Sequence, residues 1–207
     1  AKLKYYHFVE TSLDGIPLVV TRTGWTGEIG YEIYLRDGSK GDELWERIMA
    51  AGRPFQIRPT GPSDIRRVEA GILNWGADVT LEDNLYEVGL DRLVDLDKPG
   101  PYIGKEALER IRREGAKRKL VGIEIAGDRI EFNATKWPVS HRGPIVGKVT
   151  SALWSPRLRK NIGYAMVPSA LAETGTALTV HLPHGEERSA TVVPKPFLDP
   201  DKKIPKS

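Results

Sequence analysis

The stretch Thr21–Leu35, TRTGWTGEIGYEIYL, decides how the first part of the chain folds. Glycine recurs there at every third position, which predicts two tight turns because glycine reaches positive φ without strain. The last six residues then alternate like a half-buried strand, so that Glu32 and Tyr34 share one face. A carboxylate and an aromatic ring on one face, beside a turn that carries Trp25, form a suitable site for a planar heterocycle that bears amine hydrogens.

The same pattern also fits a second interpretation, in which no ligand is involved. Trp25 and Tyr31 are then core aromatic residues, the glycines are ordinary hairpin turns, and Glu32 is a solvated residue of a strand. The pattern alone does not separate the two interpretations.

The composition of the chain restricts its class. With 207 residues, of which 40% are apolar and 29% charged, it is typical of a globular protein with one large or two modest domains. The sequence has no apolar run long enough to cross a bilayer and begins without a hydrophobic signal region, which predicts a cytoplasmic protein with no membrane partner. The lack of cysteine excludes disulfides and thiolate chemistry, and four scattered histidines predict no metal site.

The net charge of +3 is too small to predict a nucleic-acid partner. Residues 105–120 nevertheless hold seven basic residues against three acidic ones. Glutamate and arginine four residues apart within this segment favour a solvated helix face with internal ion pairs. Contact with a polyanionic ligand is the alternative interpretation.

The first 116 residues predict a mixture of strands and helices. Residues 5–35 are typical of hairpins, with one turn at Asp14-Gly15. Apolar periodicity and a following glycine predict three helices, at residues 42–51, 65–70 and 102–114. In the first of these helices we expect Trp45 to lie in the core. Ser63 or Asp64 is placed to cap the second.

The rest of the chain predicts a different domain. Short apolar runs at 120–125, 145–153, 161–167 and 177–182 are separated by turn residues, which is typical of a small barrel or sandwich. We therefore expect an α+β fold with domains at residues 1–116 and 117–207. The tail from Pro194 contains four prolines and is expected to be an extended strap.

Several motifs resemble those of one family. Residues 24–33, GWTGEIGYEI, resemble the GYTGEDGFE-type signature of the glycine cleavage T-protein, or aminomethyltransferase, and of related tetrahydrofolate-dependent demethylases. Residues 64–71, DIRRVEAG, resemble the RDxLRLEAG helix of the family, and residues 103–108, IGKEAL, its FIGKEAL step. Residues 149–164, VTSALWSPRLRKNIGY, resemble the VTSGxxSPxLxKNIAxGY signature of its C-terminal barrel. In order along the chain, the matching segments are 22–35, 64–76, 84–90, 102–108 and 147–167.

The resemblance implies the C-terminal part of a T-protein folate-binding domain followed by a small antiparallel β-barrel. It also implies tetrahydrofolate as the cofactor, with Glu32 accepting hydrogen bonds from the pterin amine and ring N–H, and with Trp25 and Tyr34 in the same site. The arginine that the family has just before the aspartate of this helix is Ser63 here, and Arg66 or Arg67 is the candidate replacement. Bracing of the helix through Glu69 is the alternative role for Arg67.

The resemblance further implies that the chain is the C-terminal part of a longer enzyme. The aspartate that serves catalysis in the family lies in an N-terminal half, so no catalytic residue is assigned in this chain. We expect that half, or a partner chain, to supply it, and we expect the first domain to expose apolar surface where the partner segment would sit.

Two segments indicate one branch of the family. Residues 74–80, NWGADVT, and 84–90, NLYEVGL, are similar to the YGNDMT and NTPYExGL patterns of dimethylsulfoniopropionate demethylases. This similarity favours a demethylase of one-carbon metabolism that moves a methyl group from a small sulfonium, amine or methoxy donor to tetrahydrofolate. A sulfonium has no proton to recognise, so aromatic faces suit it best. The candidate substrate-binding residues are Trp25, Tyr34, Trp75 and Tyr86, with core packing as the competing explanation for each.

Three alternatives stay open. One is a glycine cleavage aminomethyltransferase, although Ser63 and Arg92 stand where that enzyme has arginine and tryptophan. Another is a non-catalytic folate-binding module like the iron–sulfur repair proteins of the superfamily. The third is the folate half of a flavoenzyme that oxidises sarcosine or dimethylglycine.

Overall fold

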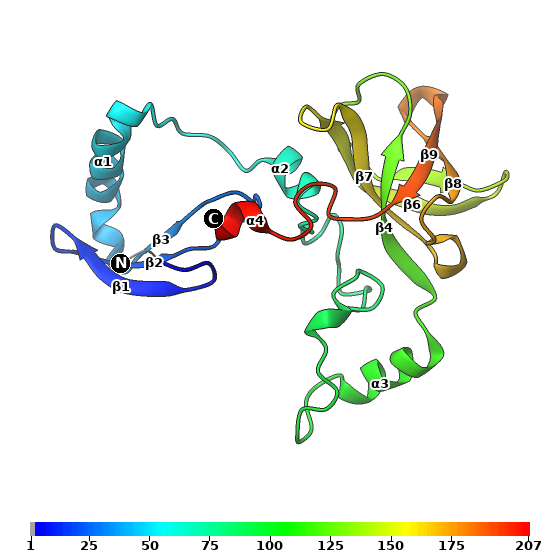
Figure 1. The fold of residues 1–207 in the computed structure, drawn as a ribbon, viewed down its shortest axis with the longest axis horizontal. Helices are drawn as coiled ribbons and strands as arrows, with labels where there is room; N and C mark the ends of the chain where they lie inside the picture. The colour runs from blue at the N-terminus through cyan, green and yellow to red at the C-terminus, as the bar shows by residue number, and fades with distance from the viewer. Residues whose placement is uncertain (1–2) are drawn as a thin grey trace. The chain divides into compact units, whose positions relative to one another are not determined.

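A computed structural model describes residues 3–207 (Figure 1). The chain divides into two compact units. The first contains the chain up to Arg66 together with residues 199–207, and the second contains Arg67–Leu198. The predicted domain boundary near residue 116 does not coincide with the boundary between these two units, and it stays a prediction.

The first unit is a three-stranded antiparallel sheet with one long helix. Its strands are β1 (Phe8–Leu13), β2 (Ile16–Thr21) and β3 (Glu32–Leu35), in that order across the sheet. The helix α1 (Gly41–Gly52) lies between the short 3₁₀ turns η1 (Gly38–Lys40) and η2 (Arg53–Phe55), and it covers one face of the sheet (Figure 1). Positive φ at both residues of the β1–β2 turn, Asp14 and Gly15, is what a two-residue hairpin loop requires.

The core of the first unit is small. Ile16 and Leu18 of β2 are buried against Leu44 of α1, with Val20, Leu35 and Ile48 packed beside them. The prediction that Trp45 lies in this core is wrong, because its side chain is 51% exposed. Three strands cover only the stripe of α1 that carries Leu44, and the next residue along the helix points about 100° away.

Large apolar side chains remain exposed in this unit. They include Phe8 and Val9 of β1, Ile33 of β3, and Tyr31, which immediately precedes β3. All six residues of β1 are exposed, although this strand pairs with β2 along its whole length. The sheet therefore presents apolar groups and an open edge on the described part of the chain.

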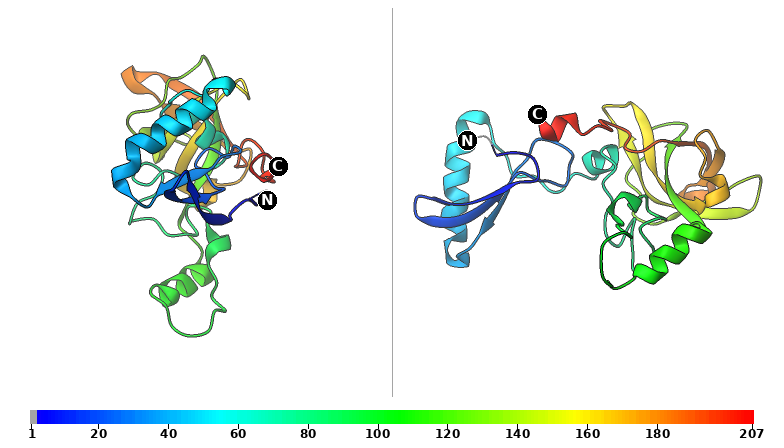
Figure 2. Two further views of the ribbon diagram at one scale, coloured as in Figure 1. Left: turned by 90° about the vertical axis from the view of Figure 1, so that its left-hand side faces the viewer. Right: turned by 60° about the horizontal axis from the view of Figure 1, so that its bottom comes forward.

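The C-terminal residues return to the first unit. They contain the short helix α4 (Lys203–Lys206), which lies beside the N-terminal strands in both figures (Figures 1 and 2). The buried guanidinium of Arg22 donates a hydrogen bond of 3.2 Å to the carbonyl of Pro205 and another to the carbonyl of Ser207. The predicted extended strap is therefore wrong for the last few residues, which are helical.

The helix α2 (Asp64–Glu69) spans the boundary between the units. The Oγ atom of Ser63 accepts a hydrogen bond from the backbone N–H of Arg66 at 3.3 Å, which is the predicted cap. Gly71, with a φ of 73°, follows the helix and reverses the chain.

The second unit contains the 3₁₀ turn η3 (Asp91–Leu93) and the helix α3 (Lys105–Glu114) ahead of the barrel. The sequence predicted that α3 begins at Tyr102. It begins at Lys105 because Gly104 adopts a φ of 88°, which no α-helix contains. Gly115 ends the helix, as predicted.

A closed antiparallel barrel of six strands forms most of the second unit, which confirms the predicted small β-barrel. The strands follow the order β4-β7-β6-β5-β8-β9 around the barrel. In chain order they are β4 (Arg118–Ile125), β5 (Trp137–Ser140), β6 (Ile145–Ser155), β7 (Lys160–Pro168), β8 (Ala177–His181) and β9 (Glu187–Val193). The turns η4 (Ser169–Leu171) and η5 (Pro183–Gly185) connect the later strands.

Backbone atoms approach most closely at two glycines of the barrel. A Cβ atom on Gly147 of β6 would lie 2.1 Å from the carbonyl oxygen of Met166 in β7, and one on Gly163 would lie 2.4 Å from that of Ser151. Backbone atoms cannot swing aside as a flexible side chain can, so neither site has room for a methyl group.

We predict that Gly147→Ala destabilises the protein by roughly 1–3 kcal/mol, because the added methyl group overpacks the β6–β7 pair. Urea denaturation followed by circular dichroism measures the effect. Gly38→Ala is the control, because a Cβ atom there meets nothing within 4 Å. Equal stability of the two variants would contradict the close approach.

Lys195 follows β9, the last strand of the barrel, and is partly buried. Its Nζ atom donates a hydrogen bond to the carbonyl of Val88 at 3.2 Å and lies 5.5 Å from the centre of the Tyr164 ring. Burial lowers the pKa of Lys195 to about 8, against a smaller opposing effect of the Asp78 carboxylate. The ammonium group is therefore held in the fold at an electrostatic cost near neutral pH.

We predict that stability rises with pH above about 8, since the unfolded chain then binds the lysine proton more tightly than the folded one. Below that pH both states bind the proton and the cost is constant. Lys195→Met removes this slope and stabilises the protein at pH 7 by up to roughly 3 kcal/mol, from about 1.4 kcal/mol per pKa unit. Urea midpoints between pH 6 and about 9.5 measure it, and exposed Lys119→Met is the control. A slope that survives in Lys195→Met would refute the assignment.

Candidate functional site

The carboxylate of Glu32 is the centre of a hydroxyl-lined group on the outer face of the first sheet. Its Oε2 atom accepts hydrogen bonds from the hydroxyl of Thr23, from the Tyr34 hydroxyl at 3.1 Å and from the Thr21 hydroxyl at 3.4 Å. Thr21 stands directly opposite Glu32 across the β2–β3 pair, and Tyr34 is two residues further along β3. The period-2 prediction that Glu32 and Tyr34 share a face is consistent with these contacts.

These hydrogen bonds set the charge of the group. The Thr23 hydroxyl lowers the pKa of the Glu32 carboxyl, and the bond to Glu32 raises the pKa of the Tyr34 hydroxyl. Glu32 is therefore ionised and Tyr34 protonated at neutral pH. All three bonds end on Oε2, whereas Oε1 has no hydrogen bond within residues 3–207, so this exposed oxygen is available to a ligand N–H.

The glycine loop before β3 is held by its own contacts. Of its three glycines only Gly27 adopts positive φ, at 70°, so the expectation based on all three was too broad. The carboxylate of Glu28 lies 2.8 Å from the guanidinium of Arg66 and thereby ties the loop to α2. Trp25 in this loop is partly exposed, so it is neither a fully buried core residue nor a free surface one.

Arg67 lies in the second unit, in a completely buried polar cluster. Its guanidinium donates hydrogen bonds to Asp78 Oδ2 at 2.8 Å and to the Ser151 hydroxyl at 2.9 Å. The other oxygen of Asp78 accepts hydrogen bonds from the hydroxyls of Thr150 at 2.6 Å and Ser151 at 2.7 Å. Because these contacts are internal to the unit, they do not support a folate contact by Arg67, which stays a prediction.

Asp78 is the residue that sequence reasoning missed. Its Oδ2 atom also accepts the backbone N–H of Asn74 at 3.0 Å, so the loop from Asn74 to Val79 folds around it. The signal was present as an aspartate inside a glycine-containing loop shortly after an arginine-rich helix. Its partners Thr150 and Ser151 belong to the barrel motif, which the sequence alone does not place beside this loop.

Trp75 and Tyr86, the other predicted aromatics, also lie in the second unit. Trp75 sits on the outside of the Asp78 loop and is 66% exposed, which excludes core packing as its explanation. Tyr86 is partly buried and lines a cavity of about 300 Å³ together with Ile111, Arg112 and Leu120. Since Trp25 and Tyr34 belong to the first unit, a single site made from all four aromatics stays a prediction.

Two further findings concern residues 3–207. Nowhere in that range do three or more histidine, aspartate or glutamate side chains gather in a way that would hold a metal ion. Over the same residues, none of the helices has the length and apolar character needed to span a membrane.

Family models match most of the chain. Residues 1–98 match the model described as the GCVT N-terminal domain. Residues 118–199 match the model described as the glycine cleavage T-protein C-terminal barrel domain. The second match covers the closed barrel almost completely.

Curated relatives carry several enzyme names. The chain is 40% identical over 178 residues to an aminomethyltransferase of Synechococcus sp. (strain CC9902), an alignment that covers 85% of this chain and 47% of the relative. It is 34% identical over 183 residues to the dimethylsulfoniopropionate demethylase of Ruegeria pomeroyi, covering 88% and 50%. It is also 34% identical over 200 residues to the mitochondrial dimethylglycine dehydrogenase of Mus musculus, covering 93% and 22%.

A solved structure has the same fold. The crystal structure of the glycine cleavage system aminomethyltransferase T from Bartonella henselae matches with a TM-score of 0.82 and 25% sequence identity, over 95% of this chain and 53% of that one. The chain spans about half the length of this protein and of the aminomethyltransferase and demethylase relatives.

Proposed function

Because the chain belongs to the glycine cleavage T-protein superfamily, we propose that it serves tetrahydrofolate-dependent one-carbon transfer. The reaction that we favour is demethylation, in which a methyl group leaves a small sulfonium, amine or methoxy donor. One observation carries the proposal, namely the ionised Glu32 carboxylate with one oxygen held by three hydroxyls and the other available.

The residues around Glu32 fit a pterin. Its exocyclic amine and the neighbouring ring N–H form a pair of donors, and a fixed carboxylate accepts such a pair as it accepts the fork of an arginine. Tyr34 offers aromatic surface at the edge of this acceptor, and Trp25 offers a second ring in the same unit. Bound tetrahydrofolate would supply the amine nitrogen that takes up the one-carbon group. Glu32 would fix the orientation of that nitrogen, which is how positioning lowers a barrier.

The proposed donor is recognised by aromatic surface. A methyl sulfonium or quaternary ammonium is held best by ring faces, and Trp75 is a large ring that its loop leaves exposed. This exposure, and the demethylase-like motif around Trp75, favour demethylation as the reaction. Sequence identity does not decide between the branches, because the aminomethyltransferase and demethylase relatives stand at 40% and 34%.

An aminomethyltransferase is the second candidate. It is favoured by the 40% identity to the Synechococcus enzyme and by the match to the Bartonella henselae structure. The two candidates share the folate site and differ in the donor, so a donor assay separates them.

We also propose that a further segment, in the same polypeptide or in a partner chain, covers the exposed apolar side chains of the first unit. Support comes from the exposed Phe8 and Ile33 and from the outer edge of β1, which pairs with no strand within residues 3–207. Hydrogen exchange tests this proposal. The β1 amides that point away from β2 should exchange fast in the isolated chain and slowly in the full-length protein, and fast exchange of these amides in both would overturn it.

The decisive experiment is titration of the full-length protein with tetrahydrofolate, followed by a panel of donors. The panel contains dimethylsulfoniopropionate, methylated glycines, methoxyaromatic compounds and an aminomethyl donor, and the measured products are methyl- and methylene-tetrahydrofolate. Absence of tetrahydrofolate binding overturns the proposal. Folate binding with turnover of an aminomethyl donor, and of no methyl donor, selects the aminomethyltransferase.

A further inference from the structure

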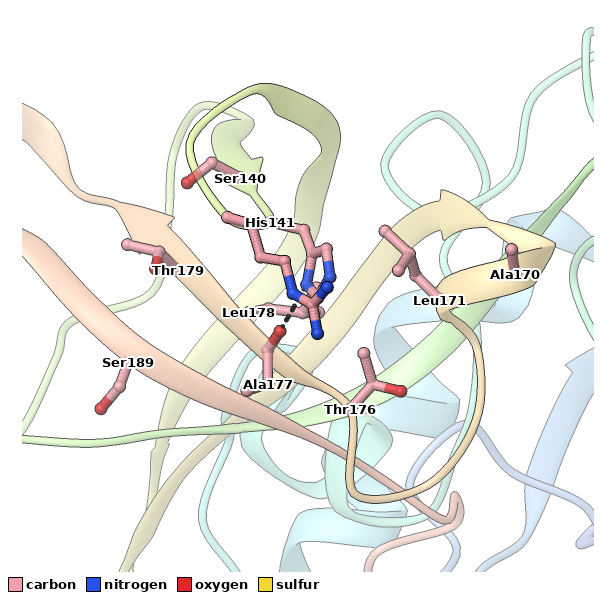
Figure 3. Close-up of a pocket in the computed structure, with 10 residues that line it drawn as sticks. Ser140, His141, Ala170, Leu171, Thr176, Ala177, Leu178, Thr179 and Ser189 are labelled. Atoms are coloured by element: carbon pink, nitrogen blue, oxygen red, sulfur yellow. Dashed lines mark hydrogen bonds between the residues drawn. The ribbon is translucent and has the colours of Figure 1, made fainter.

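The barrel has a cavity of about 580 Å³ that the proposed folate site does not use. Figure 3 shows residues around it, with Ser140, Thr179 and Ser189 on one side and Ala170 and Leu171 on the other. All of the lining residues belong to the second unit. Its size is that of a cavity which binds a small organic molecule.

A row of hydroxyl groups forms one wall of this cavity. Ser140 of β5 pairs in register with Thr179 of β8, and Thr179 pairs with Ser189 of β9. Register partners on adjacent antiparallel strands lie about 5 Å apart and present their side chains to the same face. Leu178 and Val180, on either side of Thr179, are buried in the barrel core, so this row faces outward into the cavity.

The hydroxyl of Ser140 is already committed to another residue. His181 Nδ1 lies 3.2 Å from a Glu187 carboxylate oxygen, which can only accept, so this nitrogen carries the proton in the neutral ring. His181 Nε2 then accepts the Ser140 O–H at 2.8 Å. The hydroxyls of Thr179 and Ser189 have no such partner within residues 3–207 and can donate to a ligand.

Arg142 contributes a positive charge to the lining of the cavity. Arg142 follows β5 with a φ of 53°, a left-handed conformation that arginine rarely adopts, and its exposed side chain lines the cavity. Its guanidinium has no hydrogen bond or ion pair to the described part of the chain. None of the ten lining residues is acidic, so this charge is not compensated inside the cavity.

The remaining walls are shaped by apolar and fixed groups. Leu171 and Leu178 line the cavity. The ring of His141 is anchored by a hydrogen bond of 2.9 Å between Nδ1 and the carbonyl of Ala177, drawn as a dashed line in Figure 3. The cavity therefore combines an uncompensated guanidinium, two free hydroxyl donors and apolar surface.

We propose that this cavity is a second ligand site, specific for a small organic carboxylate with an apolar body. The guanidinium of Arg142 takes the carboxylate as a bidentate partner, and the hydroxyls of Thr179 and Ser189 donate to it. The apolar body packs on Leu171. The site needs no contribution from Glu32 or from a folate, so it stands or falls independently of the proposed function.

Amide NMR spectra of the protein, recorded during titration with hexanoate, test the site. Hexan-1-ol supplies the apolar body without the charge, and inorganic phosphate supplies an oxyanion without the apolar body. We expect hexanoate to shift the amides of Leu171, Thr179 and Ser189 and to bind at least about tenfold more tightly than either control ligand. No shift with hexanoate overturns the site, and phosphate or hexan-1-ol binding as tightly as hexanoate overturns the proposed ligand class.

Matched arginine variants test the contact itself. Arg142→Gly removes the guanidinium at a position where glycine is favoured, so the fold is retained. Arg159→Gly makes the same change at another exposed arginine of the barrel, with a φ of 54° and outside the cavity. We expect hexanoate affinity to fall about tenfold or more in Arg142→Gly, to fall several-fold in Thr179→Val, and to stay unchanged in Arg159→Gly. An unchanged affinity in Arg142→Gly overturns the proposal.

Discussion

Asp78→Ala is expected to destabilise the protein by about 3–5 kcal/mol, because it leaves the buried guanidinium of Arg67 without its anion. The side chains of both residues have 0% exposure, so water cannot replace the lost partner. The hydroxyls of Thr150 and Ser151 and the N–H of Asn74 lose the same acceptor. Urea denaturation, followed by the fluorescence of the tryptophans, measures the loss.

Two controls make this result specific. Glu124→Gln breaks an exposed ion pair of the same barrel, which Lys160 forms at 2.8 Å, and is expected to cost no more than about 1 kcal/mol. Arg67→Leu combined with Asp78→Leu removes both buried charges, and it is expected to cost less than Asp78→Ala alone. If Asp78→Ala lowers the free energy of unfolding no more than Glu124→Gln does, the buried cluster does not stabilise the fold as its contacts indicate.

Glu32→Gln is expected to weaken tetrahydrofolate binding by roughly ten- to a hundredfold and to leave the stability of the protein almost unchanged. The charge-assisted hydrogen bonds of a carboxylate to a ligand contribute about 1.5–3 kcal/mol, and an amide presents no negative charge to the same donors. Glu32 is exposed, so its replacement removes little from the folded state. Isothermal titration of the full-length protein measures the affinity.

Glu10→Gln is the matched control for this variant. Glu10 is an exposed glutamate of the same sheet, on the neighbouring strand β1, and pairs with Arg36 at 2.8 Å. We expect its folate affinity to equal that of the wild type. Tight folate binding by Glu32→Gln would mean that the pterin contact lies elsewhere, even if the protein binds folate.

The sequence predicted those helices and strands whose formation depends on residues that are neighbours in the chain. Glycine marked the ends of α2 and α3, since Gly71 and Gly115 adopt positive φ and reverse or stop the chain, and Gly52 marked the last residue of α1. The period-2 alternation after Gly30 marked β3 and the shared face of Glu32 and Tyr34. The strands β5 and β9 were not predicted. The first has only four residues and contains Pro138, and the second alternates apolar residues with outward polar ones, so that neither forms an apolar run.

The buried cluster could not be predicted because its cause is not local. Arg67 and Ser151 are 84 positions apart, and Asp78 and Thr150 are 72 apart. A charged residue whose partner is so far away in the sequence is predicted to lie on the surface. Only the folded barrel brings the two groups together. The wrong prediction for Trp45 has a similar origin. The sequence pattern showed which face of α1 is apolar, but it did not show how much of that face the sheet covers.

The return of the C-terminal residues to the first unit has a consequence for how this protein is made. Arg22 and Pro205 are 183 positions apart, so the buried guanidinium of Arg22 can donate to the carbonyl of Pro205 only after the whole intervening segment has been synthesised. Residues 67–198, which lie between them, form a unit of their own and can fold earlier on the ribosome. The packing around Arg22, in the unit that carries Glu32, is thus completed after the barrel has been synthesised, and a chain that stalls between residues 198 and 205 retains the barrel but lacks this acceptor.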